Sequence, residues 1–327
     1  MTPRWVKLAG LGVITFVLTL GFLHLIESLR RPQHARSVSP YSFDIPPARH
    51  GEVVLAAGDI ADCDHLAAAE VTAKMLDQMP GTVLTLGDNV YPNGTAASYQ
   101  ECFEPTWGRH KEQIHPAPGN HDYSTPSAAG YFEYFGPLAG EKGLGYYSFD
   151  VGAWHVISLN SQCKYAGGCE RGSRQELWLR QDLKQNAGKC ILAYWHNPLF
   201  SSGRHGHDLS VKPFWDDLYE AGADIVLNGH DHDYERFAPQ NTEGAPASNG
   251  IREFVVGTGG SGNRVIFGSA PNSEERSDNA FGVLRLALRP EGYDWDFIPA
   301  DRTGFSDGGT GTCKNFALRQ PAQRAAN

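Results

Sequence analysis

The sequence predicts an α/β (α+β) fold, a four-layer αββα sandwich of two mixed β-sheets with flanking helices. Two patterns predict it. In the first half and the middle of the chain, short apolar runs alternate with helical patterns, as they do in βαβ units. Near the end, apolar runs follow one another without a helical pattern between them, which is typical of antiparallel strands. This mixture indicates two packed sheets with helices outside them.

The first βαβ unit begins near Glu52. The run VVLAA at Val53–Ala57 is short, apolar and unbroken, as expected of a buried strand. Residues Asp64–Met79 are predicted as a helix because apolar side chains recur at every fourth position. The run TVLTL at Thr82–Leu86 then predicts the next strand.

The middle of the chain contains a predicted hairpin and a predicted helix. Tyr146–Asp150 and Trp154–Ser158 surround the short turn Val151-Gly152-Ala153 and are expected to pair. Further on, Ser173-Arg-Gln-Glu176 is a capping box, in which the serine and glutamate side chains bond to free N–H groups at the start of a helix. We therefore expect a helix from this point to about Asn186.

The remaining elements continue these two patterns. A strand, a helix and a strand are predicted at Cys190–Tyr194, Lys212–Ala221 and Asp224–Leu227. The last third contains three apolar runs without helical periodicity, at Glu253–Val256, Phe281–Leu288 and Tyr293–Ile298. The last of these runs is expected to close the domain.

Residues 1–29 are predicted as an N-terminal signal anchor or signal peptide. Leu8–Ile26 is a run of 19 residues without charge, long enough to span a bilayer, and no small-x-small cleavage site follows it. These features favour an uncleaved anchor over a cleaved peptide. They predict contact with a membrane through this segment and an extracytoplasmic domain, membrane-anchored or secreted.

The rest of the chain divides into three predicted parts. Residues 30–50 are rich in proline and basic residues and are predicted as a linker. Residues 51–318 form one predicted domain, and residues 319–327 a predicted disordered tail. The formal net charge of −9 argues against a protein that binds duplex nucleic acid, because such binding needs basic patches. The sequence predicts no particular oligomeric state.

Six cysteines in an exported chain indicate disulfide bonds. Cys163 and Cys169 enclose a short glycine-containing loop and are the favoured pair. The spacing of the other cysteines does not pair them. Cys190 opens an apolar strand, so a second interpretation of it is a buried thiol.

Polar segments stand at five positions where predicted strands end, and four of them directly follow a longer apolar run. The segments are Gly58-Asp59, Gly87-Asp88-Asn89-Val90-Tyr91, Gly119-Asn120-His121-Asp122, His196-Asn197-Pro198 and Gly229-His230-Asp231-His232. The carboxyl ends of strands in α/β sheets line one rim, where ligand sites gather. Carboxylate, imidazole, amide and phenolate groups are metal ligands. One such segment alone is explained by a helix cap or a turn, but the five together predict a metal site.

The series GD, GDxxY, GNH, H and GHxH resembles the calcineurin-like metallophosphoesterase superfamily, specifically its purple acid phosphatase branch. The resemblance covers about residues 52–300. Most members of the wider superfamily carry a histidine two residues after the first aspartate. This chain has Ala61 there and Tyr91 instead, the same exchange that purple acid phosphatases make.

The resemblance implies a centre of two metal ions. The first ion, Fe(III) in the family, would be bound by Asp59, Tyr91 and His232. The second, a divalent Fe, Zn or Mn, would be bound by Asn120, His196 and His230. Asp88 would bridge the two ions. His121 would face the substrate, and His205 matches a family histidine thought to protonate the leaving group.

The implied reaction is hydrolysis of a phosphate ester with a metal-bound hydroxide as the nucleophile. The charge of the two ions exceeds that of their anionic ligands and the hydroxide by about one unit, which suits a small phosphate-ester dianion. This favours a phosphomonoesterase of the acid phosphatase type. A phosphodiesterase acting on nucleotides or phospholipid head groups is an alternative. A non-catalytic surface binding protein is another, although no ligand is missing from the motifs.

Several other polar residues are predicted to have no role as ligands. His110, His115 and His155 are expected to be structural. His207 and Asp208 either line the pocket or are solvated in their loop, and the second interpretation is favoured. The run Gly257–Gly262 lacks the lysine of a nucleotide-binding loop and is expected to turn near the metal site. Substrate specificity is expected in the loops 92–112, 123–145 and 201–212.

Overall fold

The computed structural model describes residues 43–47, 49–266, 268–300 and 304–319. The predicted anchor or signal peptide, most of the predicted linker and residues 320–327 of the predicted tail lie outside these ranges. Within the ranges, no helix has the length and apolar character that crossing a bilayer requires.

The first sheet is mixed and has six strands in the order β15-β14-β13-β1-β3-β5. Their bounds are β1 Glu52–Ala57, β3 Thr82–Leu86, β5 Ile114–Ala117, β13 Gly282–Arg289, β14 Gly292–Pro299 and β15 Asp307–Thr312. Strand β1 is parallel to β3 and antiparallel to β13, so the βαβ part of the chain and its C-terminal strands share one sheet. Strands β2 (Ala61–Asp62) and β4 (Val90–Tyr91) form a separate small pair.

The second sheet has seven strands in the order β12-β10-β11-β9-β8-β7-β6. Their bounds are β6 Tyr147–Val151, β7 Trp154–Ser158, β8 Cys190–Tyr194, β9 Ile225–Asn228, β10 Tyr234–Phe237, β11 Arg252–Val256 and β12 Ser273–Ser277. Strands β7, β8, β9 and β11 are parallel. Strand β6 pairs antiparallel with β7, β10 pairs antiparallel with β11, and β12 pairs antiparallel with β10. The parallel strands bring their carboxyl ends to one rim.

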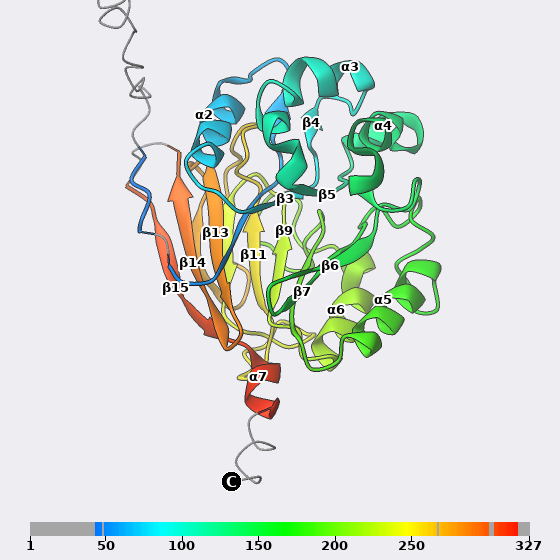
Figure 1. Ribbon diagram of the computed structural model, residues 1–327, viewed down its shortest axis with the longest axis vertical. Coiled ribbons are helices and arrows are strands. Elements are labelled where there is room, and N and C mark those ends of the chain that lie inside the picture. The colour runs from blue at the N-terminus through cyan, green and yellow to red at the C-terminus, as the bar shows by residue number, and fades with distance from the viewer. Residues whose placement is uncertain (1–42, 48, 267, 301–303, 320–327) are drawn as a thin grey trace, which may run out of the picture. The chain divides into compact units, whose positions relative to one another are not determined.

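The helices lie outside the sheets (Figure 1). The α-helices are α2 Ala67–Leu76, α3 Ala96–Ser98, α4 Ala129–Phe135, α5 Arg174–Gln185, α6 Lys212–Glu220 and α7 Lys314–Arg319. Shorter turns are the π-helix η1 Tyr99–Phe103 and the 3₁₀ helices η2 Trp107–Gln113, η3 Asp122–Ser124, η4 Pro126–Ala128, η5 Gly136–Ala139 and η6 Leu209–Val211.

The second sheet separates two hydrophobic cores. Along β8, Leu192 and Tyr194 face the core between the sheets, whereas Ile191 and Ala193 face the core under α5 and α6. This alternation is the period of two that a strand imposes on its side chains. The predicted sandwich is therefore confirmed.

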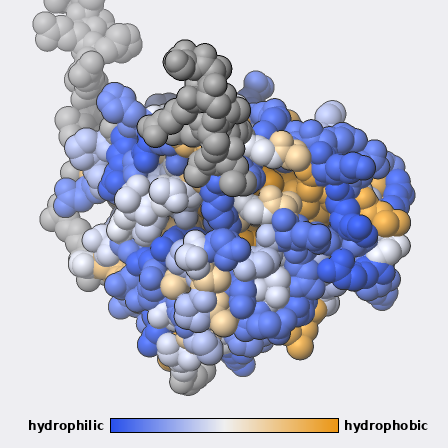
Figure 2. Space-filling model, turned by 90° about the horizontal axis from the view of Figure 1, so that it is seen from below, coloured by the Kyte–Doolittle hydropathy of each residue, from blue (hydrophilic) through white to orange (hydrophobic). Residues whose placement is uncertain are grey.

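The face of the molecule in Figure 2 is mostly hydrophilic, with hydrophobic residues in small groups.

Several predicted elements agree with the structure closely. Strands β3, β7 and β8 have the predicted bounds. Helix α5 begins after Ser173, whose side chain accepts a hydrogen bond from the Glu176 N–H, as the capping box predicts.

The last strand of the domain was predicted wrongly. Tyr293–Ile298 does not close the domain, because β15 and α7 follow it. Strand β15 has the sequence DGGTGT, with no apolar side chain to indicate a strand, and it is held by pairing with β14 at the edge of the first sheet. The predicted helix Asp64–Met79 is also shorter at both ends, as α2 spans Ala67–Leu76.

The last residues of the predicted linker contact the domain. Phe43 and Ile45 pack against the core between the sheets. Arg49 forms an ion pair with Asp296 on β14 at 3.0 Å, and Arg285 on β13 donates a hydrogen bond to the Pro46 carbonyl at 2.9 Å. These contacts hold the start of the described chain along the first sheet.

All six cysteines form disulfides: Cys63–Cys102, Cys163–Cys169 and Cys190–Cys313. The predicted pair Cys163–Cys169 is confirmed. The interpretation of Cys190 as a buried thiol is wrong, because its partner lies 123 residues away in the sequence. Disulfides of this number are typical of proteins from oxidising compartments.

Candidate metal centre

The seven predicted ligands meet at the rim formed by the ends of β1, β3, β5, β8 and β9. On one side, the Tyr91 hydroxyl lies 2.7 Å from Asp59 Oδ1 and 2.8 Å from Asp88 Oδ2 and shares its one proton between them. The same hydroxyl lies 3.1 Å from His232 Nε2. The predicted ligands of the first ion are therefore within contact distance of one another.

The predicted ligands of the second ion form an adjoining group. His196 Nε2 lies 3.1 Å from Asn120 Oδ1 and 3.2 Å from His230 Nδ1. It also lies 3.3 Å from Asp88 Oδ2, the oxygen that accepts from Tyr91. Asp88 thus stands between the two groups, where a bridging ligand has to be. Ligand atoms of Asp59, Asp88 and His196 lie within 4.8 Å of one another, and all three residues are buried.

Hydrogen bonds outside the centre orient two of the imidazoles. His196 Nδ1 lies 2.9 Å from the Leu86 carbonyl, and His232 Nδ1 lies 2.7 Å from the Gly262 carbonyl. A carbonyl accepts the Nδ1 proton and leaves Nε2 without one, which is how metal-binding histidines are held. The Gly257–Gly262 run therefore turns beside the centre, as predicted. Ser261 N also donates to the Asp59 carbonyl at 2.9 Å.

The backbone at the rim is bent to bring the ligands together. Asp59, Asp88 and His230 have φ values of 58°, 49° and 73°, a left-handed conformation that non-glycine residues seldom adopt. Gly119 has no room for a side chain, since a Cβ would stand 2.2 Å from Asp88 Oδ1. A glycine at this position lets the loop that carries Asn120 approach Asp88.

Burial and charge set the protonation of the metal-free cluster. Burial disfavours the charged forms of Asp88 and His196. The negative charge of Asp88 and the positive charge of His196 nevertheless stabilise each other. The pKa of Asp88 therefore lies below its usual range, and the pKa of His196 is raised to about 9. Burial and the carboxylates of Asp59 and Asp88 raise the pKa of Tyr91 well above its ordinary value. Tyr91 becomes a phenolate ligand only if strong positive charge is bound beside it.

His230 is prepared as a neutral ligand. Burial and the neighbouring His196 and His205 lower its pKa to about 3. Two buried carboxylates, a phenol that needs a cation to ionise and three imidazoles together fit metal ions of high charge. The placement of the seven residues agrees with the sequence analysis, and their assignment to individual ions stays a prediction.

The two predicted catalytic histidines lie on either side of this cluster. His121 Nδ1 lies 2.8 Å from the Pro92 carbonyl, and its ring centroid is 4.1 Å from that of Tyr91. The His205 ring is 4.2 Å from that of His230, and its Nδ1 lies 2.9 Å from Asp231 Oδ1. In both histidines, Nδ1 is engaged and Nε2 is left for a substrate.

Two supporting carboxylates were not singled out from the sequence. Asp231 holds His205 and accepts a hydrogen bond from the Ser201 hydroxyl. Asp122 is buried and accepts from Gly119 N at 2.8 Å and from Tyr99 Oη at 2.6 Å. Both lie within the recognised motifs, but their partners Tyr99, Ser201 and His205 come from other segments, so motif spacing gives no signal of these roles.

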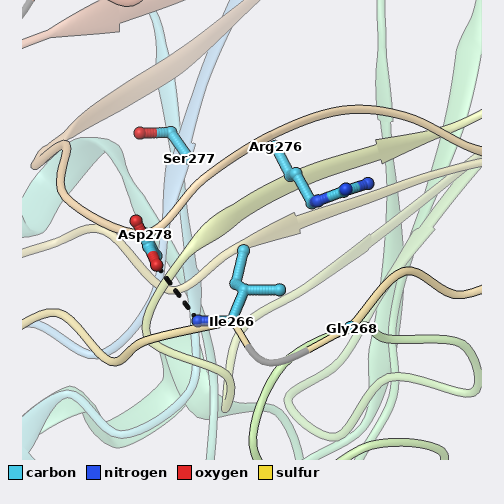
Figure 3. Close-up of a pocket in the computed structure, with 5 residues that line it drawn as sticks. All are labelled: Ile266, Gly268, Arg276, Ser277 and Asp278. Atoms are coloured by element: carbon cyan, nitrogen blue, oxygen red, sulfur yellow. Dashed lines mark hydrogen bonds between the residues drawn. The ribbon is translucent and has the colours of Figure 1, made fainter.

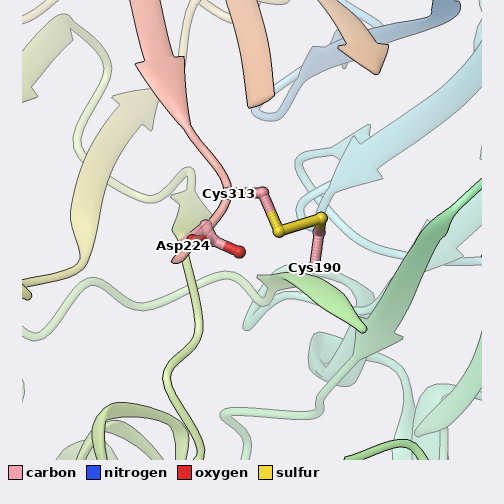
Figure 4. Close-up of side chains that lie close together, drawn as sticks. All are labelled: Cys190, Asp224 and Cys313. Carbon is pink, nitrogen blue, oxygen red and sulfur yellow. A yellow bond between two sulfur atoms is a disulfide. The ribbon is translucent and has the colours of Figure 1, made fainter. Parts of the chain in front are cut away.

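Two other places in the structure are separate from the metal centre. Ile266, Gly268, Arg276, Ser277 and Asp278 line an open hollow of about 440 Å³ (Figure 3). It contains no predicted ligand of the metal centre. Cys190, Asp224 and Cys313 also lie close together (Figure 4), but the two sulfur atoms are joined in a disulfide and offer no thiolate to a metal.

His155 is structural, as its surroundings show. Its ring lies between Asp150, at 2.9 Å, and Asp182, at 2.7 Å. Burial lowers the pKa of His155, but the two carboxylates outweigh burial and raise it. The stabilisation from this raised pKa is complete below the unfolded value of about 6.5 and is lost as pH rises through the folded value.

We therefore expect His155→Asn to reduce the loss of stability that the protein shows as pH rises above about 6.5. Urea unfolding of the metal-free protein and of the variant, at several pH values from 6 to 9, measures the difference. The same pH dependence of stability in both proteins would contradict the structural role of His155 between the two carboxylates.

Comparison with known proteins agrees with this geometry. The family model described as calcineurin-like phosphoesterase matches residues 44–234. Purple acid phosphatase 15 of Arabidopsis thaliana is 26% identical over 277 residues, which are 71% of this chain and 49% of the relative. The chain thus spans about half the length of that relative.

Two solved structures share the fold. A purple acid phosphatase, PPD1, from yellow lupin (Lupinus luteus) seeds has a TM-score of 0.64 at 18% identity, and the match covers 84% of this chain and 56% of that one. GAP50, the anchor in the inner membrane complex of Plasmodium, has a TM-score of 0.62 at 15% identity. The match covers 81% of this chain and 89% of that one. The family match spans more than half of the 327 residues and contains all seven predicted ligands. The chain belongs to the calcineurin-like phosphoesterase family, and its relatives there are purple acid phosphatases.

Proposed function

We propose that this protein is a phosphomonoesterase of the acid phosphatase type that uses Fe(III) and a divalent Fe, Zn or Mn ion. The observation that carries the proposal is the placement of Asp88 between two groups of ligands, each of which is complete. When bound, the two ions supply positive charge for the ester and activate water for attack on phosphorus.

The protein's own residues position the ester and handle its protons. His121 and His205 present Nε2 on either side of the ligand cluster, where phosphate oxygens and the leaving group are expected. Asp231 fixes the His205 ring, so that a proton on Nε2 points at the leaving-group oxygen. The short rigid contacts around both rings favour one orientation of the substrate.

Two alternatives are distinguished by specific features. GAP50 has this fold and is described as an anchor, so the fold alone does not decide between an enzyme and a binding protein. The complete ligand set and the two free histidine nitrogens favour an enzyme. A phosphodiesterase remains the second candidate, because the same ligands can bind a diester.

We also propose an extracytoplasmic location, with the domain tethered to a membrane through residues 1–29 or secreted. Three disulfides among the described residues support an oxidising compartment.

Phosphate release by the purified full chain is the test. We expect metal-dependent hydrolysis of a monoester, with lower kcat/KM for a matched diester, in assays from pH 4 to 9. A chelator-treated sample should lose the activity and recover it when iron and zinc are restored. Equal rates on both esters would favour the phosphodiesterase, and no release by protein that holds both metals would favour the binding protein.

A further inference from the structure

Most of the exposed large apolar side chains lie on loops at the rim that carries the metal centre. Among the described residues these are Tyr165, Leu177, Leu209 and Val265. Leu177 belongs to helix α5, whereas the other three lie on segments that leave the carboxyl ends of β7, β8 and β11. Singly exposed apolar side chains are common on protein surfaces, so a role for one of them has to be argued from its own contacts.

The loop that carries Tyr165 is closed and rigid. The disulfide Cys163–Cys169 joins its ends, and Gly168 N donates to the Cys163 carbonyl at 2.9 Å. Within the loop, Tyr165 N donates to the Gln162 carbonyl at 2.8 Å. Tyr165 is therefore held in place although its side chain is 44% exposed.

Two attachments join this loop to the metal centre. Ser161 Oγ and Gln162 Nε2 donate to Asn197 Oδ1 at 2.9 and 2.8 Å, and Asn197 directly follows the predicted ligand His196. On the other side, the ring of Tyr165 stacks on that of Tyr123, with centroids 4.5 Å apart and planes 9° apart.

Tyr123 packs against Tyr165 through the stacked rings. It is buried, and its hydroxyl accepts a hydrogen bond from Asn160 Nδ2 at 2.9 Å. It stands three residues after the predicted ligand Asn120 and is the second residue of the 3₁₀ helix η3. Both attachments of the loop thus lie next to ligands of the second ion.

We propose that Tyr165 is a specificity-determining residue that binds the organic part of the phosphate ester, and that it favours a flat aromatic group such as a nucleobase. The inference rests on the proposed function. Tyrosine offers a large contact area at a small loss of conformational entropy, and its partner Tyr123 already fixes the ring. The ammonium of Lys164 lies over the Tyr165 ring, 5.4 Å from its centroid. A flat group that stacks on this ring takes the place of the ammonium, whose positive charge then stands beside an anionic ester.

A pair of esters that differ only in the aromatic group tests the proposal. Adenosine 5′-monophosphate and ribose 5-phosphate have the same leaving oxygen, so their chemical reactivity is matched. We expect the metal-loaded full chain to favour the adenosine ester by about tenfold in kcat/KM, the gain that stacking of one base provides. The preference should lie in KM, because the base is remote from the reacting bond.

Three variants give the controls. Tyr165→Ala is expected to bring the preference below about twofold, because kcat/KM should fall far more for the adenosine ester than for ribose 5-phosphate. Tyr165→Phe keeps the ring and is expected to keep the preference. Leu177→Ala removes a side chain of similar exposure on α5 and should change neither ester.

The outcomes separate this inference from the proposed function. Hydrolysis of both esters by the wild-type protein without a preference would overturn the inference alone. An equal loss on both esters in Tyr165→Ala would also overturn it, because it would show a structural role of the loop. No hydrolysis of either ester by metal-loaded wild-type protein would overturn the proposed function, and the inference with it.

Discussion

Asp88→Asn is expected to lose metal and phosphoesterase turnover together. Asparagine has the shape of aspartate and still accepts the hydrogen bond that His121 N donates to Asp88 Oδ1 at 2.7 Å. It lacks the negative charge that a ligand shared by two cations supplies. Groups that only orient metal ligands contribute 10- to 100-fold to affinity or activity, so we expect the loss of this bridging carboxylate to reduce kcat by more than about a hundredfold.

Metal content and activity should be measured on the same samples. Elemental analysis after dialysis reports the ions bound per chain, and monoester hydrolysis reports turnover. Asp278→Asn is the matched control, since the same change is made in the separate hollow. A fully active Asp88→Asn protein with both metals bound would contradict the proposed centre.

The metal centre could be predicted from the sequence because its chemistry restricts the residue types. Only a few side chains bind metal ions, and parallel strands bring their carboxyl ends to one rim, so Asp59, Asp88 and His196 were expected to meet. The bridging position of Asp88 came from the family resemblance, and the distances to Tyr91 and His196 agree with it.

Other parts of the site depend on contacts between distant segments. Asp231 forms a hydrogen bond with His205, 26 residues away in the sequence. The ring of Tyr165 stacks on that of Tyr123, which belongs to another loop. Neither pair follows from spacing, because each side chain alone fits an ordinary loop. Such residues are found only when the backbone has been placed.

Three strands at or next to the edges of the sheets could not be predicted for a similar reason. Strands β10 (YERF), β12 (SEERS) and β15 (DGGTGT) lack the apolar runs that identified the central strands. They are strands because a neighbour offers free N–H and C=O groups to pair with. Central strands such as β8 are buried on both faces, and their sequence alone indicates them.

The Cys190–Cys313 disulfide is expected to contribute more stability than any other cross-link in the chain. It connects β8 with the segment between β15 and α7 and closes a loop of 123 residues. In the chain-entropy description, a loop of this length stabilises the folded state by about 5 kcal/mol. Cys163–Cys169 closes a loop of 6 residues, for which the same description gives about 2 kcal/mol.

Two double variants therefore form a matched pair: Cys190→Ala/Cys313→Ala and Cys163→Ala/Cys169→Ala. Urea unfolding of both against the wild-type protein should give a free-energy loss about 3 kcal/mol larger for the first. Its monoester turnover should stay unchanged at temperatures where it is folded, because Cys190 opens β8 about 20 Å from His196, which follows the other end of that strand. Equal losses in the two variants would show that loop length does not govern their contribution. A loss of turnover in the folded first variant would show that the C-terminal segment is coupled to the metal centre, which the position of the disulfide argues against.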